Sequence, residues 1–212
     1  TQSWGGESDR EIVDNTVNDV ASTVLSEVDT VNLLSATEDL TDAAWAKAGG
    51  VTATETTISR PDVGLLRVQQ GPVAGTSNVP AVTFADLTYI DLQYAYVGIF
   101  DGIWRWWVFD ILNGVSIGPY AGSFADDGWI EDNGDGSYRC SALYTGSADV
   151  YVGVFVSDSP TDPNSTNPGS MGITNMQLEQ SATLHDYVPN TGKPTDTVLS
   201  DNFNAPDVNV LT

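Results

Sequence analysis

Residues 103–140 read IWRWWVFDILNGVSIGPYAGSFADDGWIEDNGDGSYRC, and this stretch decides the fold class. Side chains of residues 103–117 alternate between two faces as in a β-strand, and Asn113-Gly114 supplies the positive-φ pair of a two-residue hairpin turn. A second break at residues 132–136 precedes another strand-like run, residues 137–144. The sequence therefore predicts two antiparallel hairpins in the middle of the chain.

Further strand-like runs flank these hairpins on both sides. They cover residues 51–59, 65–69, 82–87, 90–100, 149–156 and 171–179. In the run 149–156, four valines share one face, while Tyr151, Gly153 and Phe155 share the other. About ten strands with almost no helix between them predict an all-β fold, a two-sheet antiparallel jelly-roll sandwich.

The N-terminal part of the chain follows a different pattern. Ser8 and Glu11 fit a capping box, which predicts that a short helix starts at residue 8. Valines then recur at spacings of four, three, four and seven residues: Val13, Val17, Val20, Val24 and Val31. This seam of β-branched side chains favours a parallel coiled-coil trimer. The alternative is an amphipathic helix that lies on its own domain, because the segment is rich in Asn, Asp and Thr.

These patterns predict that the chain has three parts. Residues 1–31 form an arm and helix for oligomerisation or attachment, and residues 32–192 form the jelly-roll sandwich, which is long enough to bury a core. Residues 193–212 are a polar C-terminal tail or linker with short apolar pieces. This tail could add a strand to a neighbouring subunit or connect to a further part.

Charge and composition exclude several classes of partner. The chain has 29 acidic and 7 basic residues, a formal charge of -22, so it repels nucleic acid and bare phospholipid. No window approaches the roughly 18 apolar residues of a membrane helix, and no membrane insertion is expected. The lone Cys140 excludes an internal disulfide or a cysteine-rich metal site, and we expect it to be a small apolar residue near a strand.

Few residues suit catalysis or metal binding. His185 is the only histidine and no Gly-x-Ser-x-Gly elbow is present, so no nucleophilic triad is indicated, and zinc has too few ligands. Asp132 and Asp135 are candidate calcium ligands, because calcium takes six to eight oxygens, but turn chemistry also explains them. With 29 acidic residues, a carboxylate pair for glycoside hydrolysis arises by chance. We expect no enzyme, no catalytic residue and no cofactor other than possible calcium.

Aromatic residues are the more informative set. Exposed indole and phenol rings can stack on the apolar face of a pyranose, while neighbouring polar groups bind its hydroxyls. Arg105 shares a strand face with Trp107, and an arginine is rarely buried unpaired, so this face is predicted to reach solvent at least near the start of the strand. Trp107 and Arg105, with Tyr94 or Tyr96 beside them, are therefore the predicted carbohydrate-binding residues.

The same alternation assigns the opposite face of this strand. Trp104, Trp106 and Val108 are predicted to face the core. The alternative for all these rings is that most of them only fill the sandwich.

Three ordered segments carry a resemblance to a known family. The central frame contains Phe109-Asp110, Asn113-Gly114, Ile130-Glu131-Asp132 and Tyr138-Arg139-Cys140. Residues 32–45 are similar to the family's opening strand and short helical turn, and residues 172–180 and 187–192 to its last strand and exit. Together they resemble a module of bacteriophage tail fibres and appendages, which is itself similar to concanavalin A-like and carbohydrate-binding jelly rolls.

The resemblance implies a function and a setting. It suggests a virion surface structural protein, a tail fibre or appendage, whose jelly roll binds a glycan or another host-surface group. Other virion proteins and two further copies in a homotrimer are the implied partners, and the implied location is the exposed virion surface, extracellular after lysis. The alternatives are a head, neck or tail decoration protein that binds no glycan, and a fragment of a polysaccharide-degrading enzyme.

Overall fold

The computed structural model describes residues 31–61, 67–75, 77–121, 125–146, 149–164 and 167–190. These residues all belong to one unit, Val31–Thr212, and none of them is helical. They contain no helix long and apolar enough to cross a membrane. The predicted helix with Val13, Val17, Val20 and Val24, and the tail 193–212, lie outside the described residues. Val31, the fifth valine of the predicted seam, is 56% exposed.

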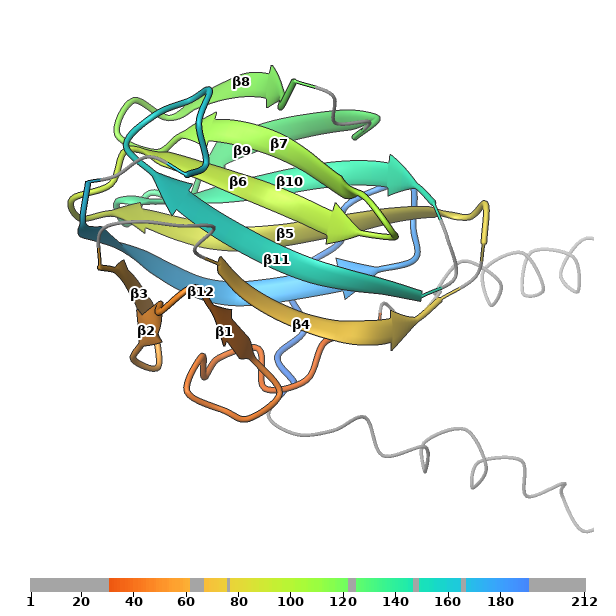
Figure 1. The fold of residues 1–212 in the computed structure, drawn as a ribbon. Helices are drawn as coiled ribbons and strands as arrows, with labels where there is room; N and C mark the ends of the chain where they lie inside the picture. Colours follow the sequence, from red (N-terminus) through yellow and green to blue (C-terminus); the bar gives the residue numbers. More distant parts are fainter. Residues whose placement is uncertain are drawn as a thin grey trace, which may run out of the picture. The chain divides into compact units, whose positions relative to one another are not determined.

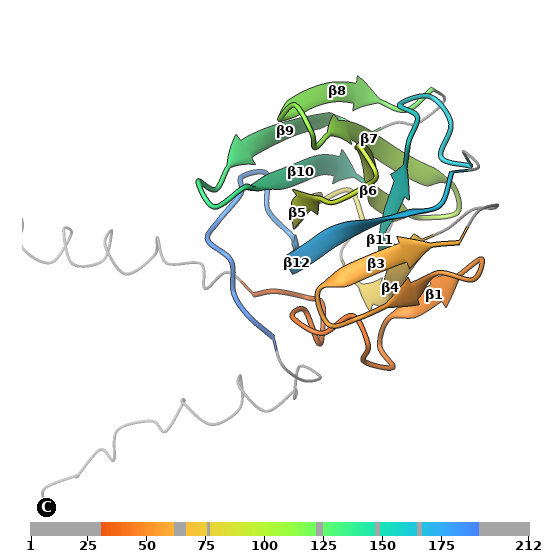
Figure 2. The ribbon, with the colours of Figure 1, turned by 90° about the vertical axis from the view of Figure 1, so that its left-hand side faces the viewer.

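Twelve strands form two six-stranded sheets (Figures 1 and 2). Sheet A has the order β1 (Ala46–Ala48), β4 (Arg67–Ala74), β11 (Asp149–Ser157), β6 (Tyr94–Phe100), β7 (Trp104–Asp110) and β8 (Val115–Pro119). Sheet B has the order β2 (Thr52–Ala53), β3 (Thr57–Arg60), β12 (Gly169–Glu179), β5 (Pro80–Tyr89), β10 (Ser137–Thr145) and β9 (Asp127–Asp132).

The connectivity of the sheets is that of a jelly roll. All neighbouring strands are antiparallel, and within the central orders β4-β11-β6-β7 and β3-β12-β5-β10 successive strands alternate between the sheets, except for the β6–β7 hairpin. The predicted all-β, two-sheet antiparallel sandwich is therefore confirmed.

Both predicted hairpins are present, but the first turn is longer than predicted. Residues 111–114 connect β7 to β8, and within this turn only Gly114 has a positive φ, 65°. The Asp110 carboxylate holds the turn by accepting bonds from the Asn113 backbone N–H at 3.1 Å and its side-chain amide at 2.9 Å. A carboxylate that satisfies turn donors removes the need for two positive-φ residues. In the second hairpin, Gly134 and Gly136 supply the positive φ angles between β9 and β10.

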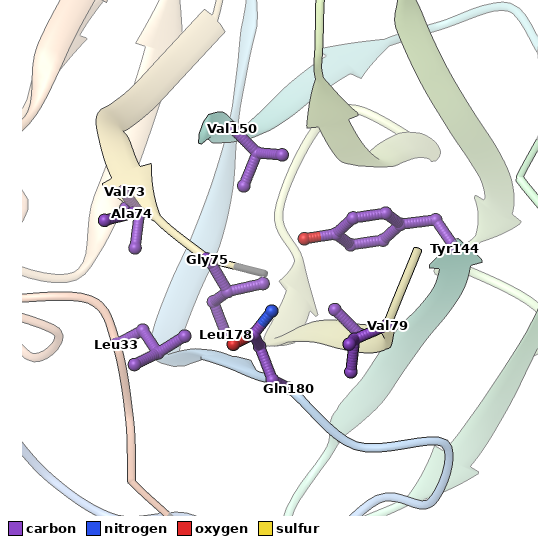
Figure 3. Close-up of a pocket in the computed structure, with 10 residues that line it drawn as sticks. Leu33, Val73, Ala74, Gly75, Val79, Tyr144, Val150, Leu178 and Gln180 are labelled. Carbon is purple, nitrogen blue, oxygen red and sulfur yellow. The ribbon is translucent and has the colours of Figure 1, made fainter. Parts of the chain in front are cut away.

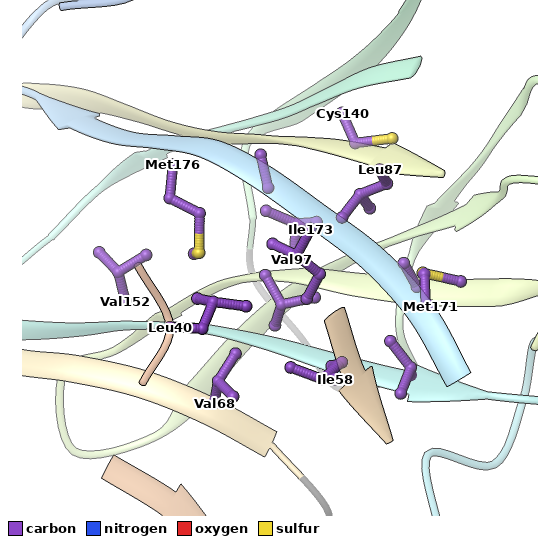
Figure 4. Close-up of a cluster of buried hydrophobic side chains, with 14 of the residues drawn as sticks. Leu40, Ile58, Val68, Leu87, Val97, Cys140, Val152, Met171, Ile173 and Met176 are labelled. Atoms are coloured by element: carbon purple, nitrogen blue, oxygen red, sulfur yellow. The ribbon is translucent and has the colours of Figure 1, made fainter. Parts of the chain in front are cut away.

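The main core lies between the two sheets (Figure 4). Val150, Val152, Val154 and Val156 of β11 all belong to it, as their alternation predicts. Cys140 on β10 is fully buried there, and burial raises the pKa of its thiol. It behaves as the small apolar core residue expected from the sequence.

The two ends of the sandwich domain meet on sheet B. The Asn32 side-chain amide donates to the carbonyl oxygens of Met176 and Val188, each at 3.0 Å. The hydroxyls of Thr37 and Tyr187 lie 2.7 Å apart, and the Tyr187 ring packs edge-on against Phe84 of β5. The segment that follows β12, which we call the exit segment, therefore lies on the outer face of sheet B.

Candidate functional site

A second apolar cluster, rich in aromatic side chains, lies on the outer face of sheet A, and we call it the outer cluster. It is separate from the main core. Directly opposed residues of antiparallel strands share a face, and the register aligns Tyr96 with Val108 and Phe155, and Phe100 with Trp104 and Tyr151. The cluster has four buried members, Tyr96, Trp106, Val108 and Phe155, with Tyr94, Trp104 and Tyr120 packed against them and partly exposed. Figure 1 shows the strands of this sheet in front.

Trp104 is the best-fixed of the partly exposed rings. Its ring stacks on Trp106 with centroids 4.1 Å apart and an interplanar angle of 15°, and Phe155 meets it edge-on at 5.5 Å. Phe100 lies on another side, with its centroid at 5.1 Å. A Cβ at Gly153 would meet the Trp104 ring at 3.3 Å, so this glycine leaves room for the indole over β11.

The Arg67 side chain of β4 lies over the Trp104 ring. The guanidinium carbon of Arg67 lies 5.1 Å from the Trp104 ring centre and 5.5 Å from that of Phe155. Its Nε donates to the side-chain oxygen of Gln69, the next outward-facing residue of β4. An aromatic platform with a cation and an amide beside it can contact both the apolar and the polar parts of a ligand.

Tyr96 positions the loop that follows β11. Its hydroxyl donates to the backbone oxygen of Ser159 at 2.8 Å, and its ring meets Tyr120 edge-on at 5.6 Å. Burial, and then the neighbouring Tyr120, raise the pKa of the Tyr96 phenol. Since Tyr96 is fully buried, its ring is closed to a ligand.

We expect Tyr96→Phe to loosen this loop without disturbing the sheet. The variant loses one partly buried hydrogen bond, which contributes about 1 kcal/mol to the free energy of unfolding. Amide hydrogen exchange of residues 157–162 should quicken relative to that of the β6 amides. Unchanged exchange in the loop would show that the Tyr96 hydroxyl does not hold it.

The predicted facing of β7 is wrong. Trp107 packs against the main core, where Phe109 is also buried, while Trp106 and Val108 belong to the outer cluster. The Trp107 ring lies over Gly128 of sheet B, because a Cβ there would come within 2.3 Å of it. Its Nε1 donates to the Ser116 hydroxyl at 2.7 Å. Trp107 therefore closes the sandwich between β8 and β9 and is no stacking platform.

Arg105 explains why the prediction failed. It does share a face with Trp107, but it sits at the beginning of β7, where the core-facing side reaches the rim of the sandwich. There its Nε and Nη2 both lie 3.0 Å from Asp101 Oδ2, and the arginine side chain keeps 20% exposure. A rim position lets an arginine face inward without isolating its charge.

Of the four predicted carbohydrate-binding residues, only Tyr94 is both on the outer face of sheet A and partly exposed. Trp104 was predicted to face the core and not the surface, and Arg67 and Gln69 were not predicted as site residues. The available signal was the pair Gly98 and Gly153, which lie opposite one another in adjacent strands. Glycine inside a strand often marks the close approach of another group.

The calcium candidates have local partners in the β9–β10 turn. Asp132 accepts a bond from the Gly134 N–H at 2.8 Å, and Asp135 accepts bonds from both the amide and the hydroxyl of Ser137. These two bonds hold the pKa of Asp135 below its ordinary value. Among the described residues, no group of three His, Cys, Asp or Glu side chains could hold a metal ion.

We expect Asp135→Ala to destabilise the domain equally with and without millimolar calcium. The ionised Asp135 carboxylate accepts two bonds from Ser137. Its contribution to the free energy of unfolding is therefore complete above the ordinary aspartate pKa and is lost as the pH falls through the lowered pKa. Thermal unfolding at neutral and acid pH measures this difference. A calcium-induced rise in Tm that the variant abolishes would contradict the turn role.

The cavity in Figure 3 is too small to bind a sugar. It opens between the ends of β4, β11 and β12 and is lined mainly by apolar side chains, including Leu33, Val150 and Leu178, with the Tyr144 hydroxyl pointing in. Its accessible volume of about 10 Å³ suits one water molecule. His185, the only histidine, lies elsewhere, and its Nδ1 is 2.9 Å from Glu179 Oε2, a contact that holds the exit segment.

Comparison with known proteins leaves the family of this chain open. No family model matches it, and no curated protein sequence is significantly similar. The function must therefore be argued from the outer face of sheet A itself.

Proposed function

We propose that the sandwich domain binds carbohydrate on the outer face of sheet A, with Trp104 as the stacking ring. The observation that carries this proposal is a partly exposed indole stacked at 4.1 Å on Trp106, with the Arg67 guanidinium over the ring and Gln69 bonded to Arg67. Tyr94, Phe100 and Tyr151 extend the aromatic surface along β6 and β11.

This combination matches the chemistry of a pyranose. The C–H face of the sugar packs on an indole, and its hydroxyls need donors and acceptors in the same plane. Gln69 and Arg67 offer these groups from a strand, so they are held by the sheet and not by a loop. A preorganised ring loses little conformational entropy when a ligand binds.

The biological setting belongs to the same proposal. We place the domain on an exposed virion surface, in a tail fibre or appendage built as a homotrimer with other virion proteins. The support is the sequence frame of residues 109–140 with its two flanking segments, and the valine spacing of residues 13–31. A charge of -22 suits an exposed, soluble surface.

A second candidate function is a contact within a protein lattice, and a different surface favours it. Leu112, Val115 and Ile117, on β8 and the turn before it, are each nearly half exposed. The strand β8 is also an edge of sheet A, so its backbone can pair with another chain. Exposed apolar side chains on a free edge are typical of interaction sites.

Titration of the full chain with a panel of neutral and acidic oligosaccharides tests the first candidate against the second. Calorimetry should detect saturable binding at physiological salt to at least one sugar class. Absence of binding across the whole panel, together with self-association that Val115→Asp abolishes, would favour the lattice contact. Release of reducing ends during the same titrations would indicate an enzyme instead.

A further inference from the structure

Arg67 differs from the other basic residues that the structure describes. Arg105 pairs with Asp101, and Arg139 forms a bidentate pair with Asp86, at 2.9 and 3.0 Å. Arg60 lies in the field of acidic groups that follow β11, and Lys47 acts on Asp39. Within the described ranges, Arg67 alone has neither an ion pair nor an acidic group acting on it.

Among the described residues, no acidic group pairs with Arg67, although the composition offers many acidic side chains. With 29 acidic residues in 212, a partly buried arginine has many possible partners, yet among the described residues Arg67 contacts Gln69 and two aromatic rings. Burial lowers the pKa of its guanidinium, which is the effect of lost water without a compensating charge, whereas the Asp86 pair raises the pKa of Arg139. The guanidinium remains a cation throughout the physiological range.

The neighbours of Arg67 leave its terminal nitrogens accessible. Its cross-strand neighbour on the β1 side is Ala48, and the next pair along is Ala46 with Gln69, so small side chains flank it there. Of the three guanidinium nitrogens, Nε donates to Gln69. The two terminal nitrogens do not belong to the buried polar atoms that lack a partner among the described side chains, so they reach solvent. A planar fork of free donors beside a stacking ring has the geometry that binds a carboxylate in a bidentate manner.

We propose that the outer face of sheet A selects a sugar that carries a carboxylate, with Arg67 as the residue that binds this carboxylate while Trp104 stacks on the ring. The inference rests on the proposed function and names its ligand class. Uronic acids and sialic acids share this chemistry. The carboxylate supplies an anion that Arg67 does not find among the residues that the structure describes.

The acidity of the chain does not prevent such recognition. At physiological ionic strength the screening length is about 8 Å, so exposed acidic groups beyond that distance repel a ligand only weakly. Burial lowers the pKa of the Arg60 guanidinium, and Asp158 and Asp162 oppose this shift, whereas burial alone accounts for the lowered pKa of Arg67. Repulsion by the net negative charge therefore disfavours long anionic polymers, but it only weakly opposes the binding of a single carboxylate at Arg67.

The test compares acidic sugars with their neutral counterparts on the full chain. The probes are an oligogalacturonate and its methyl ester, and a sialyl-oligosaccharide and its methyl ester, titrated by calorimetry at 0.15 M salt. One of the two free acids should bind about tenfold or more tighter than its ester, the effect of a hydrogen-bonded charge. The arm that binds also identifies the source of the carboxylate.

Variants assign the preference to Arg67. Arg67→Gln should abolish the preference for the acid, and Arg67→Lys should retain only part of it, because lysine keeps the charge without the fork. Lys47→Gln removes the same charge from neighbouring β1 and should leave the preference unchanged. Near-ultraviolet circular dichroism checks that each variant is folded.

Two outcomes overturn the inference, and they are distinguishable. If esters and acids bind equally, or if Arg67→Gln keeps the preference, the ligand class is wrong while carbohydrate binding stands. If none of the four probes and no other sugar binds, the proposed function fails as well. The comparison of acid with ester needs only the unmodified protein, so it remains decisive even if a variant does not fold.

Discussion

Trp107→Ala is expected to lower the free energy of unfolding by about 3–5 kcal/mol, the cost of removing a large ring from a packed core. The ring contacts the main core and lies over Gly128 of sheet B, so its loss opens a gap between β8 and β9. It also removes the 2.7 Å bond from Nε1 to the Ser116 hydroxyl, which itself donates to the Gly128 carbonyl. Urea unfolding at neutral pH measures the change.

Trp129→Ala is the matched control for this variant. Trp129 is a partly buried tryptophan on β9 of sheet B, but it belongs to neither apolar cluster. Its replacement should cost clearly less stability than that of Trp107. A loss below about 1 kcal/mol for Trp107→Ala would contradict the assignment of its ring to the core.

The contrast between Trp107 and Trp104 shows what alternation can and cannot predict. The alternation of side chains along a strand correctly separates the residues of β7 into two sets, and it correctly groups the valines of β11 in the core. It does not say which set faces inward when both sets are aromatic. The exposure predicted for Arg105 near the start of the strand does not extend to Trp107, and the rim position of Arg105 with its bond to Asp101 removes the cost of facing inward.

The strands and hairpins were predictable because local chemistry decides them. Turns at Gly114, Gly134 and Gly136 follow from the need for positive φ, and the runs between them alternate. The candidate site depends on which strands become neighbours across the jelly roll. Trp104, Gly153 and Arg67 come from three strands far apart in sequence, so only the register of sheet A brings them together.

Trp104→Ala is expected to weaken carbohydrate binding by about 30-fold or more. This factor corresponds to about 2 kcal/mol, the loss typical of a central aromatic contact. The variant removes the stacking ring and leaves Arg67 and Gln69 in place on β4. Its cost in stability should be smaller than that of Trp107→Ala: both rings are partly exposed, but Trp107 packs against the main core and Trp104 against the smaller outer cluster.

Two further variants test whether the loss of carbohydrate binding comes from the Trp104 ring itself. Trp129→Ala keeps the same side-chain change on the other sheet and should bind with wild-type affinity. Gly153→Val should reduce binding without removing any ring, because a side chain at that position would displace the Trp104 indole, which is 3.3 Å from a Cβ there. Equal loss of affinity in Trp129→Ala and Trp104→Ala would point to a general effect on folding.

The most direct test of the central claim is to observe the indole N–H signals of the six tryptophans by NMR during a titration with oligosaccharide. Single Trp→Phe variants assign the signals. We expect the Trp104 signal to shift progressively and to saturate, while the signals of Trp45, buried in the core, and of Trp129 stay in place. A saturating shift at Trp129 with none at Trp104, or no shift at any concentration, would contradict carbohydrate binding on the outer face of sheet A.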